Sequence, residues 1–252
     1  FCGLELQIES DFADLFEVKE GRVEKAGNLD VEHGMSRMTY TYTRGNFRRA
    51  VHIDLSQVPR FNGSADYEII VPPAGNWSVC VQVTPVIDAT EVTPRHQCGD
   101  SVERAAPNTR LEAWRRDLPT LSTPHDELRS LFARSTEDLA ALRLFDPEHP
   151  DRTVVAAGAP WFMTVFGRDS LITSWMAMLV DSDLALGTLE TLALFQGKKE
   201  DAVTEEEPGR ILHEMRFGES ARLSLGGGSV YYGSVDATPL FVMLLGELAR
   251  WG

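Results

Sequence analysis

The sequence predicts an α+β chain in two parts, an antiparallel β-sandwich followed by a helical region. Residues 1–100 alternate between apolar and polar positions in short segments that Gly, Asn, Asp and Pro separate. From Thr123 onward the apolar residues instead recur with a period of about 3.6, which is typical of helices. Residues 101–122 are polar and contain prolines, so we expect a linker there. The 252 residues suffice for two domains, here 1–100 and 123–252.

Five segments of the first part are predicted strands because they alternate or are rich in β-branched and aromatic residues. They cover residues 4–10, 37–44, 48–55, 67–73 and 77–87. Short strands with even spacing and no helical pattern between them favour an antiparallel sandwich.

The second part contains four segments with helical periodicity. The first covers 123–145, and its apolar stripe comprises Leu128, Leu131, Phe132, Leu139 and Leu142. A second helix follows Asp169, and a third covers 183–195. The last begins at Thr238 and runs to the chain end. Because this last helix is apolar on more than one face, we expect it to be buried against further helices.

The composition excludes several classes of partner. Hydrophobic residues make up 43% of the chain and charged residues 25%, with a formal net charge of −14. Such an acidic chain repels phosphate backbones, so we expect no nucleic-acid partner. No apolar run approaches the roughly 20 residues of a membrane span, so we expect no membrane partner either.

Cofactor motifs are also missing from the sequence. The glycines at 226–228 lack the Lys-Ser/Thr pair of a phosphate loop, and His213 has no second His at helical spacing. We therefore expect neither a cofactor nor a metal. The three cysteines have no metal-ligand spacing, and we interpret them as reduced thiols of a cytoplasmic protein. A disulfide between Cys80 and Cys98 is the alternative.

Three junctions place polar residues beside aromatic ones at a helix start. In the first, Trp161 and Phe166 precede Arg168 and Asp169. On one interpretation Asp169 caps the following helix and pairs with Arg168. On the other, this carboxylate and the aromatic rings face a ligand such as a sugar, whose C–H faces pack on rings while its hydroxyls donate to acidic oxygens.

The second junction is acidic at its start and mixed afterwards. We interpret Glu205 and the two glutamates after it as a solvated charge run. Four polar residues are interleaved with apolar ones, so one side of this segment should be buried while the other presents the polar groups. They are Arg210, His213, Glu214 and Arg216.

The third junction contains Tyr231, Tyr232 and Asp236. The preceding glycines allow a tight fold, so that both tyrosines line a surface. Thr238 can begin the last helix without help from Asp236, which leaves this carboxylate free for another role. From the residues alone, a structural and a functional role for Asp236 stay open.

At these junctions the chain resembles the glycogen-debranching and amylo-α-1,6-glucosidase-like family, within the glucoamylase-like (α/α)6-toroid group. The resemblance lies in residues 160–173, 204–216 and 226–247, and in residues 11–18, which are similar to the β-rich N-terminal domain of bacterial members. It implies a β-sandwich followed by the first helices of an (α/α)6 toroid.

The family resemblance also implies roles for single residues. Asp236 is the expected general acid, and Gly167–Asp169 are expected to hold the hydroxyls of the terminal sugar. Arg210, His213 and Glu214 are expected to line the same pocket. The implied reaction is the inverting hydrolysis of α-glucosidic bonds in an oligosaccharide or glycogen-like α-glucan. Such an acid must keep its proton, so we expect burial against the tyrosines to raise the pKa of Asp236.

In the family the general base is a glutamate far downstream. We therefore expect this chain to be a fragment that lacks the base, and glucose release by the 252 residues alone would contradict this. One alternative is a related toroid hydrolase acting on trehalose, sucrose or mannosyl-glycerate. Another is a carbohydrate-binding protein without catalysis.

Overall fold

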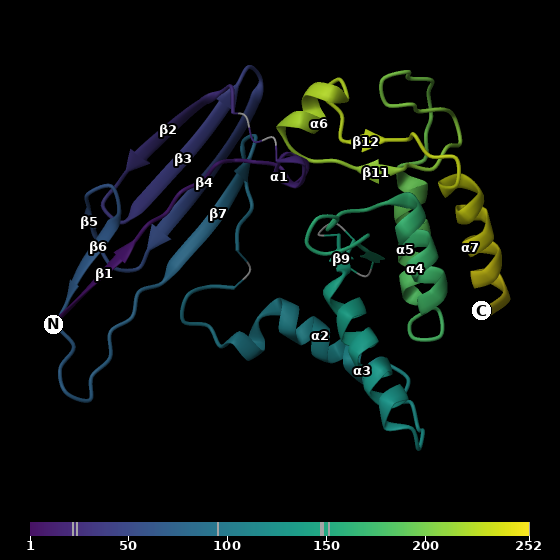
Figure 1. The fold of residues 1–252 in the computed structure, drawn as a ribbon, viewed down its shortest axis with the longest axis horizontal. Helices are drawn as coiled ribbons and strands as arrows, with labels where there is room; N and C mark the ends of the chain where they lie inside the picture. The colour runs from purple at the N-terminus through teal and green to yellow at the C-terminus, as the bar shows by residue number, and fades with distance from the viewer. Residues whose placement is uncertain (22, 24, 95, 147–148, 151, 252) are drawn as a thin grey trace. The chain divides into compact units, whose positions relative to one another are not determined.

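The computed structural model describes residues 1–252 except 22, 24, 95, 147–148, 151 and 252 (Figure 1). It confirms the α+β class, with antiparallel sheets in the N-terminal part. The chain divides into two compact units. We call Phe1–Ala13 with Arg22–Glu112 the β unit, and Asp14–Gly21 with Ala113–Gly252 the helical unit.

The β unit contains two antiparallel sheets. The larger has the order β2-β3-β4-β7-β8, and the smaller has the order β1-β6-β5. The strands are β1 (Cys2–Leu6), β2 (Asn28–His33), β3 (Arg37–Arg44), β4 (Phe47–Leu55), β5 (Arg60–Phe61), β6 (Ala65–Ile69), β7 (Val81–Ile87) and β8 (Thr90–Glu91). The predicted segments 37–44 and 48–55 correspond closely to β3 and β4, whereas the predicted 67–73 covers only the end of β6.

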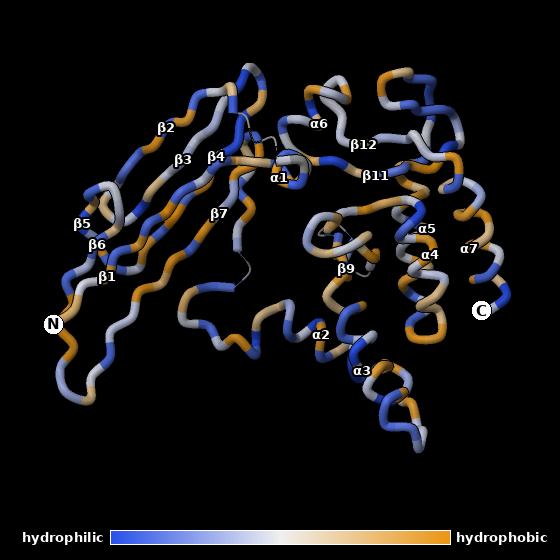
Figure 2. Tube along the Cα trace, in the orientation of Figure 1, coloured by the Kyte–Doolittle hydropathy of each residue, from blue (hydrophilic) through white to orange (hydrophobic). Residues whose placement is uncertain are grey.

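The two sheets share one hydrophobic core, as in a β-sandwich. Met38 and Tyr40 of β3 are buried together with Tyr67 and Ile69 of β6, while their neighbours along β3 remain more exposed. Ile53 of β4 lies opposite Met38 in the same core. Figure 2 shows the alternation of hydrophobic and hydrophilic residues along β4 that produces this one-sided burial.

The interpretation of all three cysteines as reduced thiols is wrong. Cys80 and Cys98 form a disulfide with a Cα–Cα distance of 6.0 Å, and Cys2 is free and exposed. β8 pairs antiparallel with the end of β7, so the chain turns back in the direction of Cys80, which directly precedes β7.

The helical unit is built from helices and two short hairpins. Its hairpins are β9 (Arg143–Phe145) with β10 (Thr153–Val155), and β11 (Glu214–Met215) with β12 (Val230–Tyr231). Its helices are α1 (Leu15–Glu20), α3 (Asp126–Ala141), α4 (Gly167–Ala177), α5 (Asp183–Leu194), α6 (Glu219–Ser224) and α7 (Ala237–Trp251). The predicted helix 123–145 is too long, because the chain enters β9 after Leu142.

The predicted linker 101–122 instead contains a helix, α2 (Ala106–Asp117), and a short 3-10 turn. The division between the two units falls inside α2. Two side-chain contacts hold the end of α2 in the helical unit. The Trp114 indole N–H donates to Asp181 at 2.6 Å, and Arg115 Nε donates to Glu137 of α3 at 2.8 Å.

Helices α4, α5 and α7 pack against one another around the main core of the helical unit. Leu171 of α4, Leu192 of α5 and Leu244 of α7 are almost completely buried there. By contrast, Leu128 and Leu131 of the predicted stripe on α3 are exposed. No helix in the described part of the chain combines the length and apolar character needed to cross a membrane.

Candidate functional site

A glycine at the beginning of α4 lets the three predicted junctions meet. The Gly167 N–H donates to the carbonyl of His213 at 2.8 Å. A Cβ atom on Gly167 would lie 2.1 Å from the Leu212 carbonyl oxygen and 2.9 Å from the Ala237 Cβ. Both distances are shorter than non-bonded atoms tolerate, so only glycine permits this approach. The start of α4, the segment before β11 and the start of α7 therefore meet at one point.

This close approach places Arg168 beside Asp236. The Arg168 Nη1 lies 3.1 Å from Asp236 Oδ2, and the Ser234 hydroxyl donates to Asp236 Oδ1 at 2.5 Å. The Arg168 and Asp236 side chains remain 49% and 38% exposed, so the pair is accessible from solvent. Asp236 directly precedes α7, and its carbonyl accepts from the N–H of Leu240, which leaves the carboxylate for Ser234 and Arg168.

The expected rise in the pKa of Asp236 is not what the structure shows. Hydrogen bonding from Ser234, together with the hydrogen bond and charge of Arg168, holds the pKa of this carboxyl below its ordinary value. Burial acts in the opposite direction but is outweighed. Asp236 is therefore an anion in this state of the molecule.

The hairpin β11–β12 connects the second junction to the other two. The His213 N–H donates to the Tyr231 carbonyl at 2.8 Å, and Glu214 lies opposite Tyr231 in the hairpin. A further bridge joins Glu214 to Phe166, the residue before α4. The ring of His213 lies edge-on to both Phe166 and Tyr231, at centroid distances of 6.0 and 5.9 Å.

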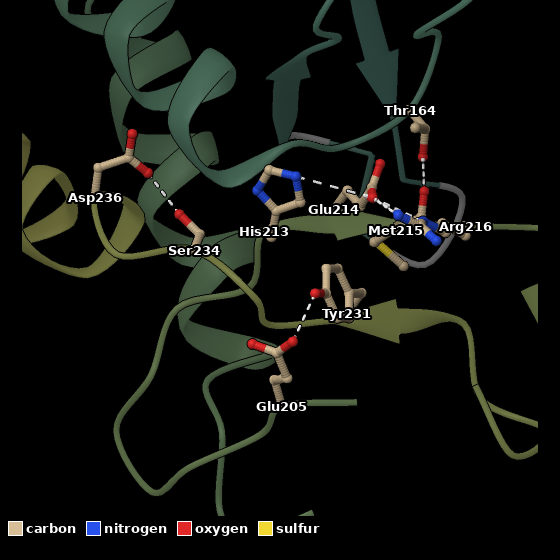
Figure 3. A network of polar contacts seen from close by, with 9 residues as sticks. All are labelled: Thr164, Glu205, His213, Glu214, Met215, Arg216, Tyr231, Ser234 and Asp236. Carbon is tan, nitrogen blue, oxygen red and sulfur yellow. Dashed lines mark hydrogen bonds and ion pairs between the residues drawn. The ribbon is translucent and has the colours of Figure 1, made fainter. Parts of the chain in front are cut away.

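The side chains on this hairpin form a polar network, which Figure 3 shows together with the Ser234–Asp236 pair. Glu214 is 4% exposed and accepts from Arg216 Nε at 2.7 Å. The Arg216 guanidinium lies 5.1 Å from the centre of the Tyr231 ring. His213 Nε2 is 3.9 Å from Glu214, while its buried Nδ1 has no hydrogen-bond partner within the described residues. A buried carboxylate such as that of Glu214 destabilises the fold unless an opposite charge pairs with it, and Arg216 is that partner.

The acidic run lies at the surface, with Glu205 and Glu207 exposed, and two of its members also form hydrogen bonds. Glu205 accepts from the Tyr231 hydroxyl at 2.8 Å, and this contact is the main reason that the pKa of Tyr231 is raised. Glu206 accepts from the backbone N–H of Lys198 at 2.8 Å. The run therefore forms an ordered loop, and Glu205 anchors Tyr231 at the edge of the network.

Three of the predicted site residues have other surroundings. Tyr232 is 6% exposed, belongs to the core, and donates to the Phe195 carbonyl at 2.8 Å, so the prediction that it lines the surface is wrong. Arg210 donates to the Glu205 carbonyl at 2.8 Å and holds the acidic loop. Trp161 is 40% exposed, on the segment that precedes α4.

The interpretation of Asp169 as a helix cap paired with Arg168 is also wrong. Phe166 occupies the N-cap position, and Asp169 is the third residue of α4, where a negative charge near the helix N-terminus is favourable. Arg168 pairs with Asp236 instead. Sequence reasoning missed Ser234 and the role of Glu205, whereas Arg216 was among the polar residues expected on the unburied side of its segment. Ser234 was detectable in principle as a helix-start residue, since serine side chains commonly accept from a nearby backbone N–H, as Ser234 does from Ala237.

The N-terminal part of the chain matches a known protein family. The match covers residues 2–82, from β1 to the beginning of β7, and the family is described as the N-terminal domain of (some) glycogen debranching enzymes. The matched range comprises less than half of the chain. The resemblance to glycogen-debranching enzymes with a β-rich N-terminal domain is thereby confirmed. The matched range ends before the polar network of the helical unit. A comparison with curated proteins gave no match.

Proposed function

We propose that this sequence belongs to a glycoside hydrolase of the glycogen-debranching kind, which hydrolyses α-glucosidic bonds with inversion. In this proposal the helical unit forms the first helices of an (α/α)6 toroid, and Asp236 is the general acid. The contact between Arg168 and Asp236 carries the proposal. It joins two of the predicted junctions across 68 residues, on an accessible surface that also bears aromatic rings.

The chemistry of the surrounding groups suits a sugar. Carboxylates accept hydrogen bonds from hydroxyl groups, guanidinium groups donate to them, and the C–H faces of a pyranose pack against aromatic rings. Asp236 and Arg168 supply the first two kinds of group. Trp161, which is exposed, and Tyr231, which is half-buried, supply rings on neighbouring segments.

Asp236 must carry a proton to act as the general acid, whereas the free site holds it ionised. A substrate that covers the site removes water from the carboxyl and offers a glycosidic oxygen that accepts a hydrogen bond from the protonated form. Both effects raise the pKa of Asp236 on binding. The proton then passes from Oδ to the leaving oxygen, while a second carboxylate activates water on the opposite face of the sugar.

The natural protein that contains this sequence tests the proposal directly. We expect it to release glucose as the β-anomer from a branched or linear α-glucan, detected by NMR during the first minutes of reaction. Preference for trehalose, sucrose or mannosyl-glycerate would instead assign it to a related toroid hydrolase. Release of the α-anomer would contradict the inverting mechanism.

The lowered pKa of Asp236 favours a second candidate, a carbohydrate-binding protein without catalysis. A permanently ionised carboxylate beside an arginine holds sugar hydroxyls well but cannot donate a proton. On this alternative the natural protein binds maltoheptaose and releases no product from any of these sugars.

A further inference from the structure

The β unit contains a cavity that none of the predicted site residues line. Its volume is about 560 Å³, within the range of roughly 300–1,000 Å³ that is usual for small-molecule sites. Two aromatic residues and several charged or amide side chains line it, chiefly Arg60, Asn62, Asp66, Tyr67, Glu68 and Trp77.

The cavity arises because β5 is shorter than its neighbour. β5 pairs with β6 only through Arg60 opposite Asp66 and Phe61 opposite Ala65. β6 continues to Ile69, and in the described part of the chain no strand pairs with that side of Tyr67 and the residues after it. Figure 1 shows β6 extending past the short β5. The lining residues surround this free edge, so the hollow is built by the fold of the sheet.

A rigid aromatic wall forms one side of the cavity. Tyr67 is buried, and its hydroxyl donates to the Gln57 carbonyl at 3.1 Å. The ring of Trp77 lies 5.3 Å from that of Tyr67 at an interplanar angle of 61°, and Trp77 also packs on the core between the two sheets. An indole held in this way loses little conformational entropy when a ligand packs against it.

The polar lining offers both donors and acceptors. Arg60 and Asp66 are neighbours across the β5–β6 pair. The Ser64 hydroxyl donates to Asp66 Oδ1 at 2.7 Å, which orients this carboxylate. Arg60 and Glu68 are exposed. Planar carboxylate, amide and guanidinium groups beside an aromatic face are the groups that adjacent hydroxyls on a pyranose ring require.

We propose that this cavity binds glucosyl units of an α-glucan chain, as a second carbohydrate site separate from Asp236. The mixture of donors and acceptors around a tryptophan fits a neutral polyhydroxylated ligand. The choice of glucan among such ligands rests on the proposed function. The cavity would hold a stretch of a long polymer, so that the protein has two points of attachment to one substrate.

The test uses the 252-residue chain and maltoheptaose. In NMR titrations we expect saturable shifts of the Trp77 indole N–H and of the backbone amides of Asp66 and Glu68. The double variant Arg60→Gln, Glu68→Gln removes two exposed charged partners, and we expect it to weaken binding at these signals about tenfold. The matched control is Glu32→Gln, an exposed carboxylate on β2 that does not line the cavity, which should leave the affinity unchanged.

Trp77→Ala should abolish the shifts of the Asp66 and Glu68 amides. Because Trp77 also packs on the core, this variant could act through folding. The double charge variant and Trp77→Phe are therefore measured beside it. Absence of shifts at millimolar maltoheptaose, or equal affinity in the double variant and the wild type, would overturn the inference. The variant Asp236→Asn distinguishes binding at the cavity from the proposed catalytic function. We expect this variant to show the same shifts at Trp77 as the wild type. Binding at the cavity without any hydrolysis by the natural protein would leave this inference standing and overturn the catalytic proposal alone.

Discussion

The Arg168 guanidinium and the Asp236 carboxylate form an ion pair at 3.1 Å, although 68 residues separate them in the chain. The pair links the first turn of α4 to the residue that precedes α7. Because both side chains are partly exposed, the pair contributes little to stability by itself. Its significance lies in the ionisation of Asp236, which Arg168 and Ser234 control together.

The approach at Gly167 should make this position intolerant of any side chain. We expect Gly167→Ala to destabilise the helical unit by about 1–3 kcal/mol, because its Cβ would overlap the Leu212 carbonyl. Urea unfolding followed by circular dichroism measures the change. Gly246→Ala is the matched control, since Gly246 lies within α7 with nothing within 4 Å of its added Cβ. It should stabilise the chain by up to about 1 kcal/mol, and equal effects of both variants would refute the steric account.

Removing either partner of Asp236 should raise the pKa of its carboxyl toward the ordinary value. Ser234→Ala removes the largest cause of the lowered pKa, and Arg168→Gln removes the next favourable one. A pH titration of the Asp236 carboxyl carbon by NMR measures each change. We expect a rise in both variants, because Ser234 contributes a hydrogen bond and Arg168 contributes both a hydrogen bond and a charge. An unchanged pKa in both variants would show that these contacts do not control the ionisation.

The ionisation of Asp236 should also appear in the pH dependence of stability. Its pKa in the folded chain lies below that of an unfolded aspartate, so its stabilising effect is complete above the unfolded pKa. The effect is lost as the pH falls through the lower, folded pKa. Unfolding free energies of the wild type and Asp236→Asn should therefore converge on acidification below the ordinary aspartate pKa. A constant difference throughout that range would argue against this linkage.

The Cys80–Cys98 disulfide should stabilise the β unit. It closes a loop of 18 residues, for which chain entropy predicts a contribution of about 3 kcal/mol. We expect Cys80→Ala combined with Cys98→Ala to lower the unfolding free energy by this order. The exposed thiol of Cys2 provides the control, since Cys2→Ser should have no comparable effect. Identical stability of the double variant and the wild type would contradict the prediction.

Local patterns were enough to predict much of the fold. The alternation of Met38, Tyr40 and Tyr42 with threonines predicts β3 and its buried face, and the structure buries these three residues. Tyr231 and Tyr232 show where such patterns end. Tyr231 is the last residue of the short strand β12, and Tyr232 follows the strand and enters the core of the helical unit.

The remaining features depend on contacts between distant segments. The pairing of Cys80 with Cys98 follows from the path of the chain through β7 and β8, and Arg168 reaches Asp236 only because Gly167 permits a close approach. The pKa of Asp236 depends on these partners, so a prediction based on burial alone had the wrong sign.

Turnover by Asp236→Asn in the natural protein that contains this sequence tests the catalytic role most directly. Asparagine keeps the size and the hydrogen-bonding reach of aspartate but has no acidic proton to donate. We predict that kcat on an α-glucan falls by about 10²–10⁴-fold while the dissociation constant for maltoheptaose changes little. Turnover within a few-fold of the wild type would contradict the role of Asp236 as the general acid.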